Sequence, residues 1–261
     1  MPAPLAFFSH IPKAAGSTLV KIIETQYRPT EILKLYASNP EPQAASPEAL
    51  GPEVRMVAGH CSFALRARLP RPCHTITILR DPVELLISLY YYIRQSPTHP
   101  WHGQIMSGAT DLRGLAALER NRQVTWIAGE RLPTGVPDHE LMASATSNLF
   151  GAGVTFGLAE AFPESVVLFS QALGWKVRAY TSQNVTRNRP ARGQLAAADL
   201  AAIEEISAID LAFYHSARAT FEARIRAQPA TFSRDLARLR QRSPVLPRLA
   251  AALSRLLRTG S

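Results

Sequence analysis

Short apolar runs alternate with helix-like segments through the first half of the chain. Residues Leu5 to Ile11 form an apolar run that predicts a strand, and apolar residues then recur at helical spacing at positions 19, 20, 22 and 23. Val54 to His60 and His74 to Leu79 are further β-branched and apolar runs that predict strands. Arg80-Asp81-Pro82 then combines an N-cap with a proline at the first helical position, which predicts a helix through about Arg94.

The second half of the chain carries mostly helical periodicity. The segments with this pattern are Leu112 to Gly129, Ala159 to Leu173 and Leu195 to Gln228. Within the second of them, Val166 to Phe169 is apolar enough to be a strand instead. Proline and glycine mark surface loops at Ser38 to Pro52 and Ser96 to Thr110.

Strands that alternate with helices predict an α/β fold of three layers, with a central parallel sheet and a helical C-terminal part. In open parallel sheets, ligands bind outside the carboxyl ends of the strands. Lys13, His60 and Arg80 each follow a predicted strand at that end. We therefore expect these three residues at one edge of the sheet.

Composition narrows the class of protein. The chain has 261 residues, 46% of them hydrophobic, which suits one globular domain with a full core. Its two cysteines, Cys61 and Cys73, form no CxxC pair, and no histidine cluster has metal-ligand spacing, so we expect neither a disulfide framework nor a bound metal. No run approaches the roughly 20 apolar residues of a membrane-spanning helix. We expect a soluble, cytoplasmic protein.

The net charge of +9 is concentrated near the C-terminus, where nine arginines from Glu222 onward face only two acidic residues. This predicts a main domain over residues 1–228 and a basic helical extension over 229–261. The chain contains no recognisable nucleic-acid-binding module, so we expect no nucleic-acid partner. Apolar residues at 245, 249, 253 and 257 among arginines are typical of an amphipathic helix on an anionic membrane, and equally of a helix docked on its own domain.

The segment from His10 to Thr18 has the composition of an anion-binding loop. Ala14, Ala15 and Gly16 are small, which lets backbone N–H groups converge at a helix N-terminus, where the helix dipole also favours a phosphate. The order differs from the nucleoside triphosphate P-loop, because Lys13 precedes the glycine and only Ser17 and Thr18 follow it. A phosphate ligand other than ATP is therefore favoured.

The order Pro-Lys-x-x-Gly-Ser-Thr at 12–18 resembles the 5′-phosphosulfate loop of sulfotransferases that use 3′-phosphoadenosine 5′-phosphosulfate (PAPS). Leu79-Arg80-Asp81-Pro82-Val83-Glu84, followed by Ser88 and Tyr90, is similar to the 3′-phosphate site of the same family. Further stretches resemble its carbohydrate-directed branch, which includes heparan sulfate 2-O-sulfotransferases. They are Ala58 to Phe63, Phe156 to Glu160, Asn184 to Arg189, and Asp210-Leu211 with Tyr214.

The resemblance implies a P-loop-like fold and a role for each matched residue. Lys13 with the loop residues Ala14, Ala15, Gly16, Ser17 and Thr18 would bind the 5′-phosphosulfate, and Arg80 with Ser88 would bind the 3′-phosphate. His60 would be the catalytic base that activates a carbohydrate or glycoconjugate hydroxyl, and the products would be the sulfated acceptor and 3′,5′-diphosphoadenosine (PAP). Asn184, Thr186, Arg187 and Arg189 would close over the nucleotide or touch the acceptor, or form an ordinary polar loop before Pro190.

The residue types suit this chemistry without the resemblance. An acceptor hydroxyl needs a base, and histidine is the side chain that titrates near neutrality. Lys13 would stabilise the charge that builds on the leaving phosphate, and Arg80 offers a planar fork for a terminal phosphate. His10 is an alternative base, and the tyrosines at 90–92 with Trp101 could line an acceptor groove, although core packing is the commoner use of such residues.

Two other functions remain open from the sequence. A nucleotide-dependent kinase could share this fold, although the chain lacks the Gly-Lys-Ser/Thr order and any obvious magnesium-binding carboxylate at a strand end. A non-catalytic protein could bind an anionic polymer through its arginine-rich tail. A transferase that uses PAPS accounts for both phosphate-binding segments and is the function we predict.

Overall fold

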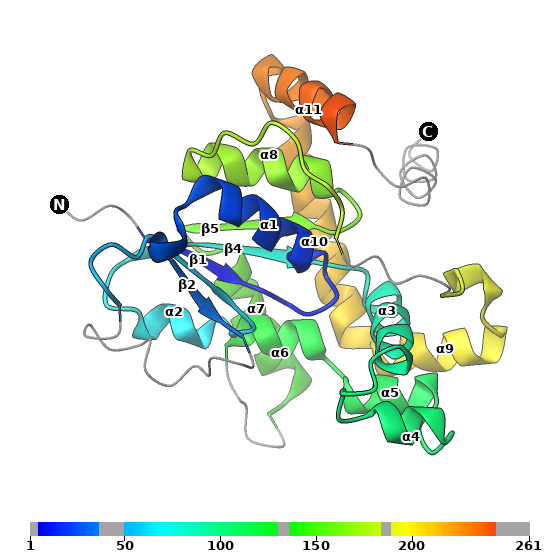
Figure 1. Cartoon of the computed structure of the whole chain (residues 1–261). Helices are drawn as coiled ribbons and strands as arrows, with labels where there is room; N and C mark the ends of the chain where they lie inside the picture. The colour runs from blue at the N-terminus through cyan, green and yellow to red at the C-terminus, as the bar shows by residue number, and fades with distance from the viewer. Residues whose placement is uncertain (1–4, 37–49, 130–135, 184–188, 244–261) are drawn as a thin grey trace.

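A sheet of five parallel strands forms the centre of the molecule (Figure 1). The computed structural model describes residues 5–36, 50–129, 136–183 and 189–243. In spatial order the strands are β2 (Ile32–Leu35), β3 (Met56–Gly59), β1 (Leu5–Ser9), β4 (Cys73–Leu79) and β5 (Val154–Leu158). All four strand pairings are parallel. The predicted α/β class with a central parallel sheet is confirmed.

Helices cover both faces of the sheet, which makes three layers (Figure 1). Side chains of β1 alternate between the faces: Phe8 packs in the cluster that contains α1 (Gly16–Gln26), and Phe7 packs in a second cluster with Leu65 of α2 (Ala64–Arg68). Every residue of β1, β3 and β5 is buried. A strand covered on both sides has no polar face, which explains why these segments appear as continuous apolar runs.

The remaining helices extend the layers and build a helical region beside the sheet (Figure 1). They are α3 (Pro82–Arg94), α4 (His102–Met106), α5 (Leu112–Leu118), α6 (Arg122–Ala128), α7 (Asp138–Leu149), α8 (Phe162–Leu173), α9 (Ala197–Ile206), α10 (Ala208–Arg226) and α11 (Ala230–Arg242), with short 3₁₀ turns at Pro29–Glu31 and Arg192–Gln194. The helix after Arg80 begins and ends as predicted, because the Asp81 side chain accepts a hydrogen bond from the Glu84 N–H and caps it.

The local predictions are confirmed in part. The segment 112–129 is mostly helical, as predicted, and divides into α5 and α6 at Asn121, which adopts a left-handed backbone conformation (φ 55°). Residues 166–169 lie within α8, so the strand alternative is wrong. The short strand β2 was not predicted, and neither was β5, which follows α7 in the predominantly helical half of the chain.

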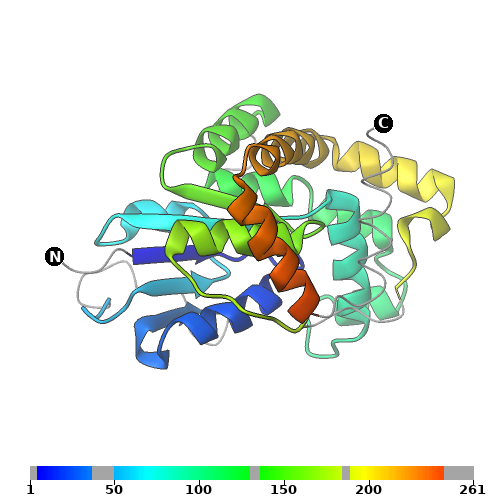
Figure 2. The same ribbon diagram turned by 90° about the horizontal axis from the view of Figure 1, so that it is seen from above.

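The last described helix, α11, lies across α8 (Figure 2). Phe232 and Leu239 of α11 are buried in the main hydrophobic cluster, and Arg240 pairs with Glu164 of α8 at 2.5 Å. The arginine-rich surface up to residue 243 thus belongs to a helix that packs on the α/β body. The division of the chain into a main domain (1–228) and a basic extension (229–261) stays a prediction. The amphipathic pattern at positions 245–257 lies outside the described residues. Within the part of the chain described, no helix has the length and apolar character needed to cross a membrane.

Candidate active site

The carboxyl ends of all five strands contribute a polar or aromatic residue to one edge of the sheet. Tyr36 follows β2, His60 follows β3, His10 follows β1, Arg80 follows β4, and Glu160 lies just beyond β5. The parallel ladder continues past the strand ends, since the His10 N–H donates to the Gly59 carbonyl and the His60 N–H donates to the Leu35 carbonyl. This edge is the place where a parallel sheet binds ligands.

Hydrogen bonds between neighbouring strands hold this edge together. The Ser9 hydroxyl donates to the Cys61 carbonyl at 2.7 Å and accepts from the Trp126 indole N–H at 3.0 Å. The Thr77 hydroxyl donates to the Ser9 carbonyl at 2.8 Å. These buried bonds fix the residues next to His10 and His60 in relation to α6 and β4.

The loop between β1 and α1 makes a tight, left-handed turn. Lys13 (φ 68°) and Ala15 (φ 63°) both have positive φ angles, and the helix begins at Gly16. N–H groups in the first turn of a helix lack an acceptor within that helix, and together with the helix dipole they favour an anion. Gly16 cannot carry a side chain here, because a Cβ atom would overlap the imidazole ring of His10. The glycine of the motif is therefore required by the histidine at its start.

Lys13 projects from this loop over an aromatic face. Its Nζ lies 3.9 Å from the centre of the Tyr92 ring, a cation–π contact from the body of α3. Burial and the nearby positive charges of Arg80 and Arg189 lower the pKa of Lys13 to about 8. Tyr92 is 43% exposed, in contrast to its half-buried neighbours Tyr90 and Tyr91. Of these three tyrosines, it is the most exposed.

Thr18 connects the loop to the segment that precedes the predicted nucleotide-closing residues. Its hydroxyl accepts a hydrogen bond from the backbone N–H of Gln183 at 2.9 Å. The chain between α8 and Gln183 thus returns along α1 to the phosphate loop. Asn184, Thr186 and Arg187, which sequence reasoning assigned to the nucleotide, lie outside the described residues.

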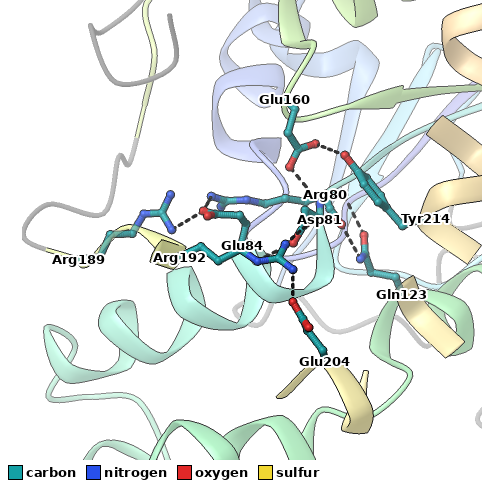
Figure 3. A network of polar contacts seen from close by, with 9 residues as sticks. All are labelled: Arg80, Asp81, Glu84, Gln123, Glu160, Arg189, Arg192, Glu204 and Tyr214. Carbon is teal, nitrogen blue, oxygen red and sulfur yellow. Dashed lines mark hydrogen bonds and ion pairs between the residues drawn. The ribbon is translucent and has the colours of Figure 1, made fainter. Parts of the chain in front are cut away.

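Arg80 joins the two predicted phosphate-binding segments directly. Its Nη1 donates to the backbone carbonyl of Lys13 at 2.8 Å, and its Nη2 lies 3.7 Å from Glu84. Glu84 also pairs with Arg189 at 2.7 Å, so both arginines share one carboxylate (Figure 3). Ser88, the second residue predicted at the 3′-phosphate, lies one turn further along α3 and is only 4% exposed.

The backbone of Arg80 is held on both sides by one side chain that sequence reasoning missed. Gln123 of α6 accepts from the Arg80 N–H at 2.9 Å and donates to the Arg80 carbonyl at 2.7 Å (Figure 3). The N-terminus of α6 is capped in turn by the Asp210 carboxylate, which accepts from the N–H groups of Gln123 and Val124.

The segments around Glu160 and Tyr214, which resemble the carbohydrate-directed sulfotransferases, meet beside Arg80. Glu160 accepts a hydrogen bond from the Asp81 N–H at 3.0 Å and another from the Tyr214 hydroxyl at 2.8 Å (Figure 3). Burial raises the pKa of the Glu160 carboxyl, and the positive charge of Arg80 opposes that rise. Burial likewise raises the pKa of Asp210 to about 6, in spite of its backbone hydrogen bonds. These residues form a buried support under Arg80.

The rings of His10, Tyr36 and His60 lie together at the ends of β1, β2 and β3. The centre of the His60 ring lies 4.6 Å from that of His10 and 4.8 Å from that of Tyr36, both in edge-on contacts. His60 is open to solvent on one side, yet its partial burial and the positive charge of Arg122 lower its imidazole pKa below 6.5. The imidazole is therefore neutral at neutral pH, as a proton acceptor must be.

His10 is poorly suited to the alternative role of base. It is 5% exposed, stacks on Phe8 at 5.1 Å, and has one ring nitrogen 3.1 Å from the Tyr36 hydroxyl and the opposite edge against Gly16. Burial, with smaller contributions from His60 and Lys13, lowers its pKa to about 3. His10 thus stays neutral and is enclosed, whereas His60 is exposed.

Within the described residues, no group of three or more His, Cys, Asp or Glu side chains is arranged to hold a metal ion. The candidate site instead presents Lys13, Arg80 and Arg189 around a helix N-terminus, with His60 nearby. This combination of fixed positive charge and a neutral imidazole can bind an anionic group and accept a proton next to it.

Comparison with known proteins gives a limited result. No family model matches the chain, and no curated protein matches it. A mouse sulfotransferase, SULT7A1, solved in complex with PAP, is similar in structure with a TM-score of 0.42 and 18% identity over 67% of this chain; the match spans only 59% of the mouse chain. A sulfotransferase from Alicyclobacillus acidocaldarius is similar with a TM-score of 0.44 and 13% identity, over 89% of this chain and 100% of that one. Because identity and TM-score are both low, we argue the function from the site itself.

Proposed function

We propose that this protein is a sulfotransferase that moves a sulfonyl group from PAPS to a hydroxyl group of a carbohydrate or glycoconjugate. His60 acts as the general base, and Lys13 stabilises the leaving phosphate. The observation that carries the proposal is that Arg80 bonds to the carbonyl of Lys13, so that the two segments suited to phosphate groups are adjacent, with a neutral histidine beside them.

The donor fits the charge and chemistry of the residues present. The first turn of α1 and Lys13 provide N–H donors and a positive charge for the 5′-phosphosulfate, and Arg80 provides further donors for the 3′-phosphate. Arg80 and Arg189 share the carboxylate of Glu84, and Lys13 adds a third positive charge close to both arginines. These positive charges suit an anionic nucleotide.

The proposed reaction requires one proton acceptor and one stabilised leaving group. The acceptor oxygen attacks sulfur, a new oxygen–sulfur bond forms, and the bond between sulfur and the 5′-phosphate oxygen breaks. The hydroxyl proton passes to an imidazole nitrogen of His60, and the negative charge that develops on the phosphate oxygen is stabilised by the Lys13 ammonium and the N–H groups of the loop. PAP and the sulfated acceptor are the products.

An acceptor of the carbohydrate class is supported by the Tyr92 side chain, which is 43% exposed. An aromatic ring suits the C–H surface of a sugar, and Tyr92 adjoins the Lys13 ammonium that would mark the reacting end of the donor. A sugar stacked there would lie on the same side of the sheet edge as the donor loop. Apolar hydroxyl compounds would also pack on this ring, so a screen of acceptors is needed to separate the two classes.

Nucleotide binding gives a direct test of the donor site. We expect isothermal titration calorimetry to show that PAP binds at least about tenfold more tightly than AMP or ATP, because AMP lacks a second phosphate and the ATP phosphates cannot reach both segments. Addition of a metal chelator should leave the PAP affinity unchanged. Tighter binding of ATP, or binding lost on chelation, would instead favour a nucleotide-dependent kinase.

A further inference from the structure

The imidazole of His60 is held by rings and not by a carboxylate. Neither of its ring nitrogens makes a hydrogen bond to any residue that the structure describes, and its ring contacts are the edge-on ones with His10 and Tyr36. In many enzymes a histidine base is oriented by an acidic side chain bonded to its second nitrogen.

Tyr36 and His10 are themselves fixed. The Tyr36 hydroxyl lies 3.1 Å from Nδ1 of His10, and their rings meet edge-on at 5.7 Å. His10 is held from below by stacking on Phe8 and from the side by the close approach of Gly16. His10 is a neutral imidazole, so it can take part in this bond without adding a charge next to the base.

The two residues also belong to the framework that carries the base. His10 continues β1 and Tyr36 follows β2, and these two strands flank β3, which ends at His60. A ring from each neighbouring strand end therefore contacts the ring from the central one. Such edge-on aromatic contacts stabilise a ring beyond simple burial and favour one ring orientation over others.

We propose that Tyr36 and His10 form a positioning pair that orients the His60 imidazole toward the acceptor hydroxyl. The proposal rests on the function proposed above, and it assigns a role to a tyrosine that no sequence motif marked. Neither residue touches the donor or the acceptor in this scheme. Their effect on the reaction passes entirely through the orientation of His60.

Substitutions at Tyr36 separate its two contacts. Tyr36→Phe keeps the ring beside His60 and removes the hydroxyl bonded to His10, and we expect a two- to tenfold lower kcat, the effect of one net hydrogen bond. Tyr36→Leu removes both contacts and should lower kcat by about 10- to 100-fold, the size of effect that a misplaced catalytic group produces. In both variants the calorimetric Kd for PAP should stay within about twofold of the wild type, because the contact of Tyr36 with the loop segment is through His10, whose ring is also held by Phe8 and Gly16.

Tyr27→Phe is the matched control. It also removes a tyrosine hydroxyl bonded to a ring nitrogen, that of Trp175 at 3.0 Å, but at the opposite end of α1. It should leave kcat and the PAP affinity unchanged. If Tyr27→Phe lowers kcat as much as Tyr36→Phe does, the loss at Tyr36 is a general consequence of destabilisation, and the positioning role is wrong.

A second measurement tests the pair without relying on activity. In histidine-selective NMR spectra, the His60 ring protons should show ring-current shifts and nuclear Overhauser contacts to His10 and Tyr36. Tyr36→Leu should abolish these shifts and move the His60 pKa back toward 6.5, because the ring becomes more solvated. Unchanged His60 spectra in Tyr36→Leu overturn the positioning pair even if PAP binds. If Tyr36→Leu changes the His60 spectra but the wild-type protein does not bind PAP, the ring contacts are supported and the proposed function is contradicted.

Discussion

At the scale of single residues, Lys13 and His60 must be in opposite protonation states for the proposed reaction. The neutral imidazole of His60 accepts a proton, and the ammonium of Lys13 carries charge to the leaving phosphate. Burial lowers the pKa of both groups, but the effect on the protonation state differs between them. It keeps His60 neutral at neutral pH, and it brings the titration of Lys13 close to the physiological range.

Replacement of His60 by alanine should affect the chemical step alone. We expect kcat to fall by about 10² to 10⁴, the usual contribution of a general base, with PAP affinity nearly unchanged. Lys13→Ala should weaken PAP binding and lower turnover together, because Lys13 would contact the donor in both the ground state and the transition state. His139→Ala, at an exposed histidine on α7, is the control. Near-normal turnover in His60→Ala would place the base elsewhere.

The pH dependence of kcat/KM should be bell-shaped. As pH falls through the His60 pKa, below 6.5, the imidazole becomes protonated and the rate declines. As pH rises through about 8, Lys13 of the free enzyme loses its proton and the rate declines again. Lys13→Arg should remove the alkaline limb within the measured range, because arginine stays charged. A wild-type rate that does not decline between pH 7 and pH 9 would exclude the assignment of Lys13, and a profile with no acid limb at any pH where the protein stays folded would exclude that of His60.

At the scale of elements, α6 supports the site from beneath. Its first residues clamp the backbone of Arg80 through Gln123, and Trp126 on the same helix donates to Ser9 at the end of β1. The helix is in turn capped by Asp210 from α10. One short helix thereby fixes the ends of two neighbouring strands, β1 and β4, which precede the residues proposed to bind the two phosphate groups.

Gln123→Leu should weaken both the fold and the donor site. The substitution keeps the approximate size of the side chain but leaves the N–H and carbonyl of Arg80 without partners, which costs about 1–3 kcal/mol of unfolding free energy for each buried group left unpaired. Urea unfolding followed by circular dichroism should show this loss, and calorimetry should show weaker PAP binding. Gln171→Leu on the exposed face of α8 should change neither quantity. Full stability in Gln123→Leu would mean that the clamp is dispensable.

At the scale of the whole molecule, those strands of the sheet could be predicted that a local sequence pattern marks. Buried parallel strands are apolar runs, and the Asp81-Pro82 boundary is specified by cap chemistry, so β1, β3, β4 and α3 were found from the sequence. The strand β5 was missed because its neighbours along the chain are helices, and its pairing with β4 spans about eighty positions that no local pattern reports.

The candidate site was predictable to a similar extent. Lys13, His60 and Arg80 could be placed at strand ends from the order of elements alone. Tyr36 could not, because it follows the unpredicted strand β2, and its contact with His10 exists only once β2 and β1 lie on either side of β3. The role of Gln123 likewise depends on a contact across 43 positions of sequence.

The hydrogen bond from Arg80 to the carbonyl of Lys13 has a thermodynamic consequence for the whole donor site. It joins the two proposed phosphate-binding segments, so a nucleotide with phosphate groups at both its 3′ and 5′ positions would bind them as a chelating ligand binds. Once one end is bound, the other is presented at a high effective concentration, whereas two separate monophosphates would each pay the full entropy of association. Selectivity would then depend on the distance between two phosphates within one ligand, more than on the affinity for either phosphate alone.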